Sequence, residues 1–295
     1  MTTIPEDRAP DRRTHAWRDD LAAEELRGRV AAPRYVEGHV AVVVASVLGL
    51  RREPRATAPL DTEAVYGERA RVLDTAEGWS WVQLVRDGYV GYVAAEGLTP
   101  DPIEPTHRVQ ALGTFLYPAA DIKAPPRLHL PLGAELAVTA SDARFAELAT
   151  GGFVIERHIA PRERHARDFV DIAERFIGVP YLWGGRTRIG LDCSGLLQIA
   201  LEAAGIAAPR DSDMQEAALG DSVLVPASLD GLERGDLVFW PGHVGIMVDG
   251  VMLLHANAHH MAVAVEPLAG AVDRIRHADS RIRAIKRLPA LSAIA

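Results

Sequence analysis

The alternation of apolar and polar residues divides the chain into three regions. Residues 14–29 favour a helix, with Leu21 and Leu26 as its few large apolar positions and Pro33 beyond its end. Residues 36–161 hold short apolar runs interrupted by Gly, Pro and Asp, a pattern typical of small all-β barrels or sandwiches. We therefore expect an N-terminal helical leader over residues 1–35, followed by β structure.

The β region contains a weak internal repeat. Residues 66–93 can be laid over residues 132–155, because both stretches begin with a glycine after an apolar residue and end in a Gly-aromatic-Val turn. Two copies of one small barrel explain this repeat, and we place them at residues 36–103 and 104–160. The alternative is a pair of generic β units that serve as spacers.

Helical periodicity returns after residue 161. Residues 164–177 and 192–204 predict helices, and Gly205 follows the second at a position that favours left-handed geometry. Four apolar runs then predict strands, at residues 236–240, 243–248, 251–255 and 262–267. Two helices followed by an antiparallel sheet predict an α+β domain over residues 161–290.

Composition and charge narrow the classes of partner. The chain has 295 residues, 48% hydrophobic and 24% charged, which suits a folded protein of two or three domains. Its net charge is −8 and its Lys and Arg residues are scattered, which argues against nucleic acid as a partner. The longest apolar run, residues 40–50, is shorter than the roughly 20 residues that a membrane span needs. Because residues 1–20 lack the apolar core of a secretory signal, we expect a cytoplasmic protein.

The single cysteine, Cys193, lies in surroundings that suit a nucleophile. One cysteine forms no internal disulfide, and no Cys/His cluster has zinc-ligand spacing, so we expect no metal or cofactor. A lone cysteine is usually a small buried hydrophobe. Here, however, it falls in the first turn of a helix with Asp192 as a cap, where the positive helix end lowers the thiol pKa. The backbone N–H groups that follow it, from Ser194 onward, can face an oxyanion.

Two of the eleven histidines are candidates for its partners. His243 opens a buried strand after a Pro-Gly turn, and His255 ends the next strand after four apolar residues. Either one alone is more typical of a structural side chain, but together with Cys193 they suggest a base and a residue that orients it. A three-residue loop at 248–250, with Gly250 left-handed, would pair His243 with His255, whereas a two-residue loop would place them on opposite faces.

Residues 164–287 resemble the NlpC-type cysteine peptidases of bacterial cell walls, which are papain-like. The family pattern is Tyr-x-Trp-Gly-Gly, Asp-Cys-Ser-Gly, Gly-Asp-Leu with Gly-His-Val-Gly, and a His-Ala strand end, and every piece is present. The resemblance implies a papain-like catalytic domain with Cys193 as nucleophile, His243 as base and His255 as third polar residue. It also places the Tyr181 hydroxyl near the oxyanion site.

The flanking regions resemble one subgroup of that family. The first barrel is similar to a bacterial SH3-like domain, the second is a more diverged copy, and the segment Pro-Arg-Asp-Ser ends at Ser212. These features resemble γ-D-glutamyl-L-diamino-acid dipeptidyl-peptidases, which recycle murein peptides. The resemblance implies cleavage between γ-D-Glu and meso-diaminopimelate or lysine in peptides with a free N-terminal L-Ala, without a cofactor or an obligate protein partner. The alternatives are a wall-lytic endopeptidase on intact peptidoglycan, a related acyltransferase, or a non-catalytic peptidoglycan-binding protein.

An exopeptidase of this kind must recognise a free amine, which a carboxylate at a fixed distance from the nucleophile can bind. Asp211 is the first candidate, and the alternative is that it only caps the following helix. The resemblance adds Glu63 and Tyr89 of the first barrel as substrate contacts. The expected substrate-binding set is completed by Trp183, Asp192, Ser194 and Ser212.

Overall fold

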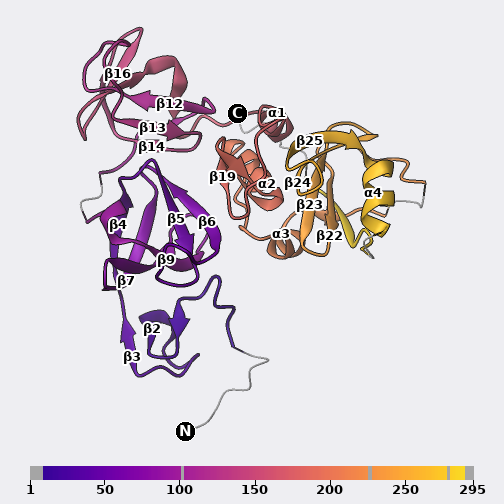
Figure 1. Ribbon diagram of the computed structural model, residues 1–295, viewed down its shortest axis with the longest axis horizontal. Helices are drawn as coiled ribbons and strands as arrows, with labels where there is room; N and C mark the ends of the chain where they lie inside the picture. Colours follow the sequence, from indigo (N-terminus) through magenta and orange to yellow (C-terminus); the bar gives the residue numbers. More distant parts are fainter. Residues whose placement is uncertain (1–8, 101–102, 225–227, 278–279, 290–295) are drawn as a thin grey trace. The chain divides into compact units, whose positions relative to one another are not determined.

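The computed structural model describes residues 9–100, 103–224, 228–277 and 280–289. The chain forms two compact units, Met1–Arg162 and Glu163–Ala295. Strands make up most of the first unit, whereas the second combines a sheet with the helices α1 to α4 (Figure 1).

The helix predicted over residues 14–29 is wrong. This segment forms β1 (Trp17–Arg18), β2 (Leu21–Ala23) and the 3₁₀ turn η2 (Glu24–Leu26), and β2 pairs with β1 and with β3 (Arg34–Val36). Leu21 and Ala23 pack into one apolar cluster, while Ala22 packs into another. Side chains that alternate between two clusters require a strand, so tertiary packing outweighs the helix propensity of the segment.

A seven-stranded antiparallel sheet follows, in the order β10-β4-β7-β8-β9-β5-β6. Alternate residues of its strands, such as Leu48 and Leu50 or Val82 and Leu84, fill one core, as the period of two predicts. The strands are β4 (His39–Val43), β5 (Val47–Arg51), β6 (Leu60–Val65), β7 (Arg69–Ala76), β8 (Trp79–Leu84), β9 (Val90–Ala94) and β10 (Leu98–Thr99).

The rest of the first unit consists of three small antiparallel sheets around a core that includes Val109, Leu130 and Val154. Its strands are β11 (His107–Val109), β12 (Gly113–Leu116), β13 (Leu128–Pro131), β14 (Glu135–Leu136), β15 (Val138–Ser141), β16 (Phe145–Leu148), β17 (Phe153–Ile155) and β18 (Ile159–Pro161). The order β17, η4 (Glu156–His158), β18 repeats the order β9, η3 (Ala95–Gly97), β10. This recurrence supports the internal repeat, and the assignment of a second SH3-like barrel stays a prediction.

The second unit is built on a six-stranded antiparallel sheet in the order β21-β26-β22-β23-β24-β25. The four strands predicted from the sequence are confirmed, and two further strands extend the sheet. Their bounds are β21 (Asp221–Ser222), β22 (Leu237–Trp240), β23 (His243–Met247), β24 (Met252–Asn257), β25 (Ala262–Pro267) and β26 (Ala284–Arg287).

Helices pack on this sheet and carry the candidate nucleophile. The predicted helix over 192–204 is confirmed as α2 (Cys193–Ala203), which packs against β23 and β24 (Figure 1). The predicted helix over 164–177 is shorter, because α1 (Phe169–Glu174) begins only where Asp168 caps it. The remaining elements are α3 (Ser212–Ala218), α4 (Leu268–His277), and the short strands β19 (Arg186–Thr187) and β20 (Gly190–Leu191).

The predicted register between β23 and β24 is wrong by two residues. Ile246 pairs with Leu254, and Val248 N–H donates to the Met252 carbonyl at 2.8 Å, so the loop spans residues 249–251. The Asp249 carboxylate sets this turn by accepting from the N–H groups of Val251 and Met252, at 2.7 and 2.8 Å. A shift of two residues keeps every side chain on its face, so the two histidines still share one face of the sheet.

Candidate active site

Cys193 is the first residue of α2 and is 8% exposed. Its sulfur accepts hydrogen bonds from the backbone N–H groups of Ser194 and Val244. Val244 directly follows His243 on β23, so the hydrogen bond from its N–H places the thiol beside the strand that carries the candidate base.

Burial sets the protonation of this pair. It raises the pKa of the Cys193 thiol to about 12, with nearby Asp192 adding to the effect, although the two backbone N–H donors act in the opposite direction. Burial also lowers the pKa of His243 to about 3. The expected low thiol pKa is therefore not found, because burial outweighs the backbone donors at the helix start. The shifts of Cys193 and His243 both favour the neutral forms of the thiol and the imidazole.

The two predicted histidines are in direct contact. His243 Nε2 lies 2.8 Å from His255 Nδ1, and the ring centroids are 5.1 Å apart. The contact is diagonal across the strand pair, because the observed register offsets the two residues by two positions. His255 is only 1% exposed, and burial lowers its pKa to about 4.

Two further polar residues extend this chain and were missed by the sequence analysis. Glu266 Oε1 lies 2.8 Å from His255 Nε2, and Arg274 of α4 makes an ion pair with the same oxygen. His255 pairs with Ala264, which puts Glu266 two residues further along β25 on the same face. The available signal was Glu266 itself, a charged residue near the end of the apolar run 262–267. Its contact with His255 could not be predicted, because the alignment of β24 with β25 does not follow from the sequence.

Asp192 holds the loop before α2 in place. Its carboxylate accepts from Gly195 N–H at 2.7 Å, as a helix cap should, and from Gly184 N–H at 2.8 Å. Gly184 has a φ of 78°, a conformation that other residues rarely adopt. The first glycine of the Tyr-x-Trp-Gly-Gly motif, Gly184, thus brings a backbone donor to this carboxylate.

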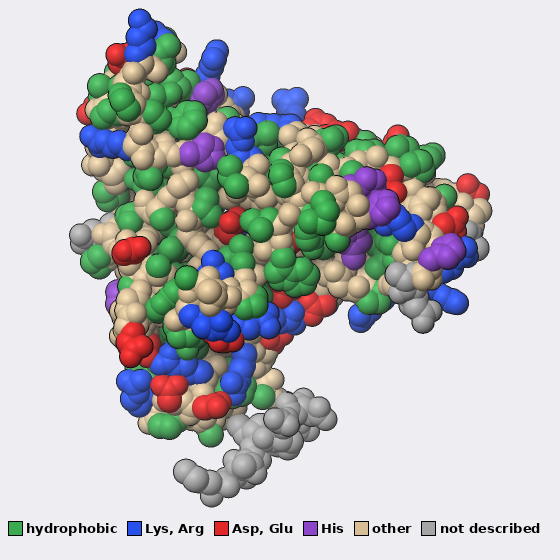
Figure 2. Space-filling view, viewed as in Figure 1, with side chains coloured by type: hydrophobic (Ala, Val, Ile, Leu, Met, Phe, Trp, Pro, Cys, Tyr) green, Lys and Arg blue, Asp and Glu red, His purple; other side chains and the backbone are tan. Residues whose placement is uncertain are grey.

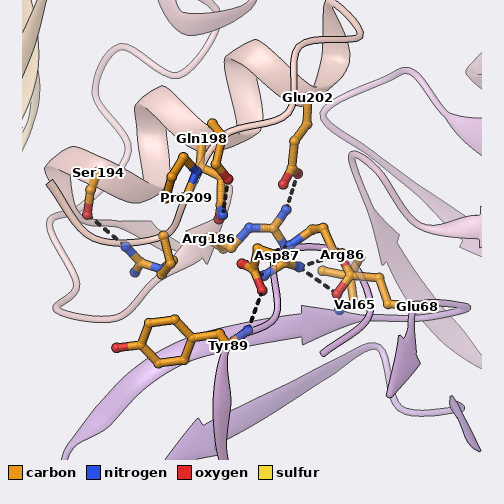
Figure 3. Close-up of polar contacts among 12 residues, drawn as sticks. Val65, Glu68, Arg86, Asp87, Tyr89, Arg186, Ser194, Gln198, Glu202 and Pro209 are labelled. Atoms are coloured by element: carbon orange, nitrogen blue, oxygen red, sulfur yellow. Dashed lines mark hydrogen bonds and ion pairs between the residues drawn. The ribbon is translucent and has the colours of Figure 1, made fainter. Parts of the chain in front are cut away.

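Arg210 ties the Pro-Arg-Asp-Ser segment to the same loop. Its guanidinium, 1% exposed, contacts both Asp192 oxygens, at 2.9 and 2.6 Å, and Ser194 Oγ at 2.8 Å. The Ser194 side chain that accepts this last bond is labelled in Figure 3. A second arginine, Arg186, forms an ion pair with Glu202 of α2 (Figure 3). The side chains of Asp192 and Ser194 therefore serve to fix the Asp-Cys-Ser-Gly segment to Arg210.

The other predicted residues of the second unit have varied surroundings. Burial and the proximity of Cys193 raise the pKa of Tyr181 to about 12, so its hydroxyl keeps its proton as a donor. Trp183 is 63% exposed. Asp211 occupies the N-cap position of α3, before Ser212, but its side chain makes no capping hydrogen bond. The alternative that Asp211 only caps this helix is therefore not supported.

Glu63 and Tyr89 belong to the first unit. Glu63 lies on β6 and is 9% exposed. Tyr89 is 5% exposed, packs into the core of the seven-stranded sheet and donates its backbone N–H to Asp87 at 3.0 Å (Figure 3). Their expected roles toward a substrate stay predictions.

One group of side chains has ligand atoms close enough for a metal ion. The ligand atoms of His255, His260 and Glu266 lie within 4.8 Å of one another. Arg274 already contacts the Glu266 oxygen, and a guanidinium there repels a metal cation.

Figure 2 shows further histidine side chains on the surface of the second unit, in contrast to the buried His255. Among the described residues, no helix is long and apolar enough to cross a membrane.

Comparison with known proteins places this site in a family. Residues 178–277 match the NlpC/P60 family, and residues 50–98 match the bacterial dipeptidyl-peptidase Sh3 domain. The gamma-D-glutamyl-L-lysine dipeptidyl-peptidase of Bacillus subtilis is 30% identical over 224 residues, which cover 67% of this chain and 72% of that protein. The chain belongs to the NlpC/P60 family.

Other members extend the likeness. Dipeptidyl-peptidase 6 of Lysinibacillus sphaericus is 29% identical over 252 residues, covering 77% of this NlpC/P60 chain and 91% of that protein. A probable endopeptidase of Mycobacterium tuberculosis is 38% identical over only 95 residues, 31% of this chain and 23% of that protein. The crystal structure of an NlpC/P60 family protein from Bacillus cereus has a TM-score of 0.70 at 21% identity and covers 85% of this chain and all of that one, which shows a shared fold.

These findings confirm the coarse predictions. The chain is an NlpC/P60 hydrolase with a papain-like catalytic domain, and the first barrel matches a bacterial SH3 domain. The match to that domain ends at residue 98, before the second β unit begins.

Proposed function

We propose that this NlpC/P60 chain is a cysteine peptidase that releases L-Ala-γ-D-Glu from murein peptides by cutting the bond to meso-diaminopimelate or lysine. The observation that carries the proposal is the placement of the buried Cys193 thiol against Val244 N–H of β23, the strand on which His243 contacts His255. Two relatives that match 77% and 67% of this chain are named as dipeptidyl-peptidases, and these names support the substrate class. A cytoplasmic location is part of the proposal and is tested by cell fractionation.

In the proposed reaction the Cys193 sulfur attacks the γ-carbonyl of D-Glu while its proton passes to His243. The imidazolium then protonates the departing amine, which leaves a thioester and a neutral imidazole. The same imidazole takes a proton from water, which attacks the thioester and releases the dipeptide and the free thiol. The Tyr181 hydroxyl, which keeps its proton, is the proposed donor to the oxyanion.

Recognition of the free amine is assigned to Asp211 in this proposal. Arg210, the neighbouring residue, contacts Asp192 and Ser194 on either side of Cys193, which fixes this backbone relative to the nucleophile. A carboxylate held in this way can form charge-assisted hydrogen bonds to an ammonium group.

The test uses L-Ala-γ-D-Glu-meso-diaminopimelate, its lysine counterpart and N-acetylated forms of both, with the products identified by mass spectrometry. We expect release of L-Ala-γ-D-Glu from the free-amine peptides, with little cleavage of the acetylated ones and none by the Cys193→Ala variant. Equal cleavage of both forms would favour a wall-type endopeptidase, for which the 38% identity of the catalytic segment to a probable endopeptidase is the specific support. Binding without cleavage would refute the peptidase proposal.

A further inference from the structure

We propose that Glu266 is a positioning residue that fixes the tautomers of both histidines, so that His243 presents a bare Nδ1 to the Cys193 thiol. This inference deepens the function proposed above and depends on it. Glu266 lies on β25, His255 on β24 and His243 on β23, so three neighbouring strands supply the chain of contacts.

The direction of each hydrogen bond follows from counting protons. An ionised carboxylate only accepts hydrogen bonds, so the 2.8 Å contact between Glu266 and His255 requires the proton to be on His255 Nε2. His255 is neutral, because its burial disfavours the charged form, and its Nδ1 is then an acceptor. The proton in the 2.8 Å contact between the two imidazoles therefore belongs to His243 Nε2. Neutral His243 is left with its lone pair on Nδ1.

The opposite arrangement would disable the site. If His255 carried its proton on Nδ1, that proton would be donated to His243 Nε2, and the proton of His243 would move to Nδ1. The nitrogen available to the thiol would then be a donor, which cannot take the thiol proton. The carboxylate thus acts on the nucleophile through two rings, although it does not contact the reacting atoms.

Arg274 holds the Glu266 carboxylate in place. It contacts the same Oε1 as His255 Nε2, and it projects from α4, which packs against both β24 and β25. The Glu266 side chain is 16% exposed, so this ion pair is partly shielded from solvent. Arg274 can only donate to Oε1, so this oxygen acts as an acceptor, which favours donation from His255 Nε2 to it.

The wild-type protein tests the inference directly. Two-bond ¹⁵N–¹H correlations of the imidazole rings distinguish Nε2–H from Nδ1–H, and His243→Gln and His255→Gln spectra assign the signals. We expect the Nε2–H tautomer for both residues, also in the Cys193→Ala background. A His243 ring protonated on Nδ1 would overturn the proposal, whether or not the chain proves to be a peptidase.

Substitutions provide the kinetic test. Glu266→Ala should shift His255 away from the pure Nε2–H tautomer and lower kcat by at least about tenfold, within the ~10²- to 10⁴-fold that a general base supplies, with KM little changed. Glu266→Gln should restore both the tautomer and most of kcat, because a glutamine oxygen can accept from the same two donors. The matched control is Asp273→Asn, which removes one carboxylate from α4 at a side chain that is 64% exposed and pairs with Arg276.

The outcomes separate the two proposals. Wild-type kcat and unchanged tautomers in Glu266→Ala would overturn the positioning role, as would an equal loss of kcat in Asp273→Asn. Undiminished turnover by Cys193→Ala would instead remove the proposed peptidase mechanism, and the ring tautomers would still decide the role of Glu266.

Discussion

Opposing influences act on Cys193. The helix start and two backbone N–H donors favour a thiolate, but burial is the larger effect and raises the thiol pKa to about 12. We expect a protonated thiol in the free protein, with its proton moving to His243 only as the substrate is attacked. Absorbance at 240 nm, taken as the difference between wild type and Cys193→Ser, should stay low where an ordinary thiol ionises, at about pH 9, and rise only as the pH approaches about 12. A thiolate signal at neutral pH that disappears in acid would show an ion pair instead.

Substitution of the candidate triad should give graded losses. Cys193→Ala and His243→Ala should each lower kcat by about 10⁴-fold or more, because each removes a group that takes part in bond making or proton transfer. His255→Ala should cost less than either, because an orienting ring biases tautomer and geometry without taking part in bond making. Steady-state kinetics with the free-amine tripeptide measure the series, and circular dichroism checks folding. A His255→Ala variant as inactive as His243→Ala would require a more direct role for His255.

Asp211 carries the proposed selectivity for a free amine. Asp211→Asn keeps the size of the side chain but removes its charge, so it should raise KM for the free-amine peptide by about 10- to 100-fold. The preference over the N-acetylated peptide should narrow accordingly. Competition between the two peptides in one reaction measures that preference. If Asp211→Asn discriminated as well as wild type, the amine would have to bind elsewhere.

At the scale of elements, the sequence predicted most of the second unit. The strands around His243 and His255 follow from apolar runs bounded by turns, and α2 follows from its cap at Asp192. The register did not follow, because the Asp249 carboxylate selects the turn through two hydrogen bonds that the pattern does not reveal. Glu266 was missed for the same reason, since its contact with His255 depends on how β24 and β25 align.

The N-terminal segment shows the opposite case. Its composition favours a helix, yet Leu21, Ala22 and Ala23 lie in a strand between two apolar clusters. The local sequence pattern does not show that both faces of this segment are buried. The residues that bury one face, such as Leu73 and Trp81, come from strands distant in the sequence.

The start of helix α2 should be sensitive to the loss of Arg210, which pairs with Asp192. Arg210→Met leaves the buried Asp192 carboxylate without its ion-pair partner, which should destabilise the second unit by about 3–5 kcal/mol. Hydrogen exchange of the α2 backbone amides reports on this unit specifically. The control is Arg276→Met, whose ion pair with Asp273 is exposed and should contribute less than about 1 kcal/mol. Equal effects of the two substitutions would contradict the role given to Arg210.

At the scale of the whole molecule, the extent of each likeness separates the rival activities. The dipeptidyl-peptidases match over 67–77% of the chain, and the SH3 match within residues 50–98 belongs to the same class. The probable endopeptidase matches over 31%, confined to a catalytic segment. The combination of both units therefore favours the proposed action on soluble peptides over action on intact wall.

Action on soluble peptides and action on intact wall can be distinguished with one preparation of peptidoglycan. In intact peptidoglycan the L-Ala nitrogen is an amide rather than an ammonium group, so it cannot make the charge-assisted contact proposed for Asp211. We expect the full-length protein to release no L-Ala-γ-D-Glu from purified sacculi. After an amidase has freed the stem peptides, the same protein should release the dipeptide, and Cys193→Ala should not. Mass spectrometry of the soluble fraction before and after amidase treatment makes the comparison. Direct solubilisation of untreated sacculi by wild type, and not by Cys193→Ala, would identify a wall-lytic enzyme instead.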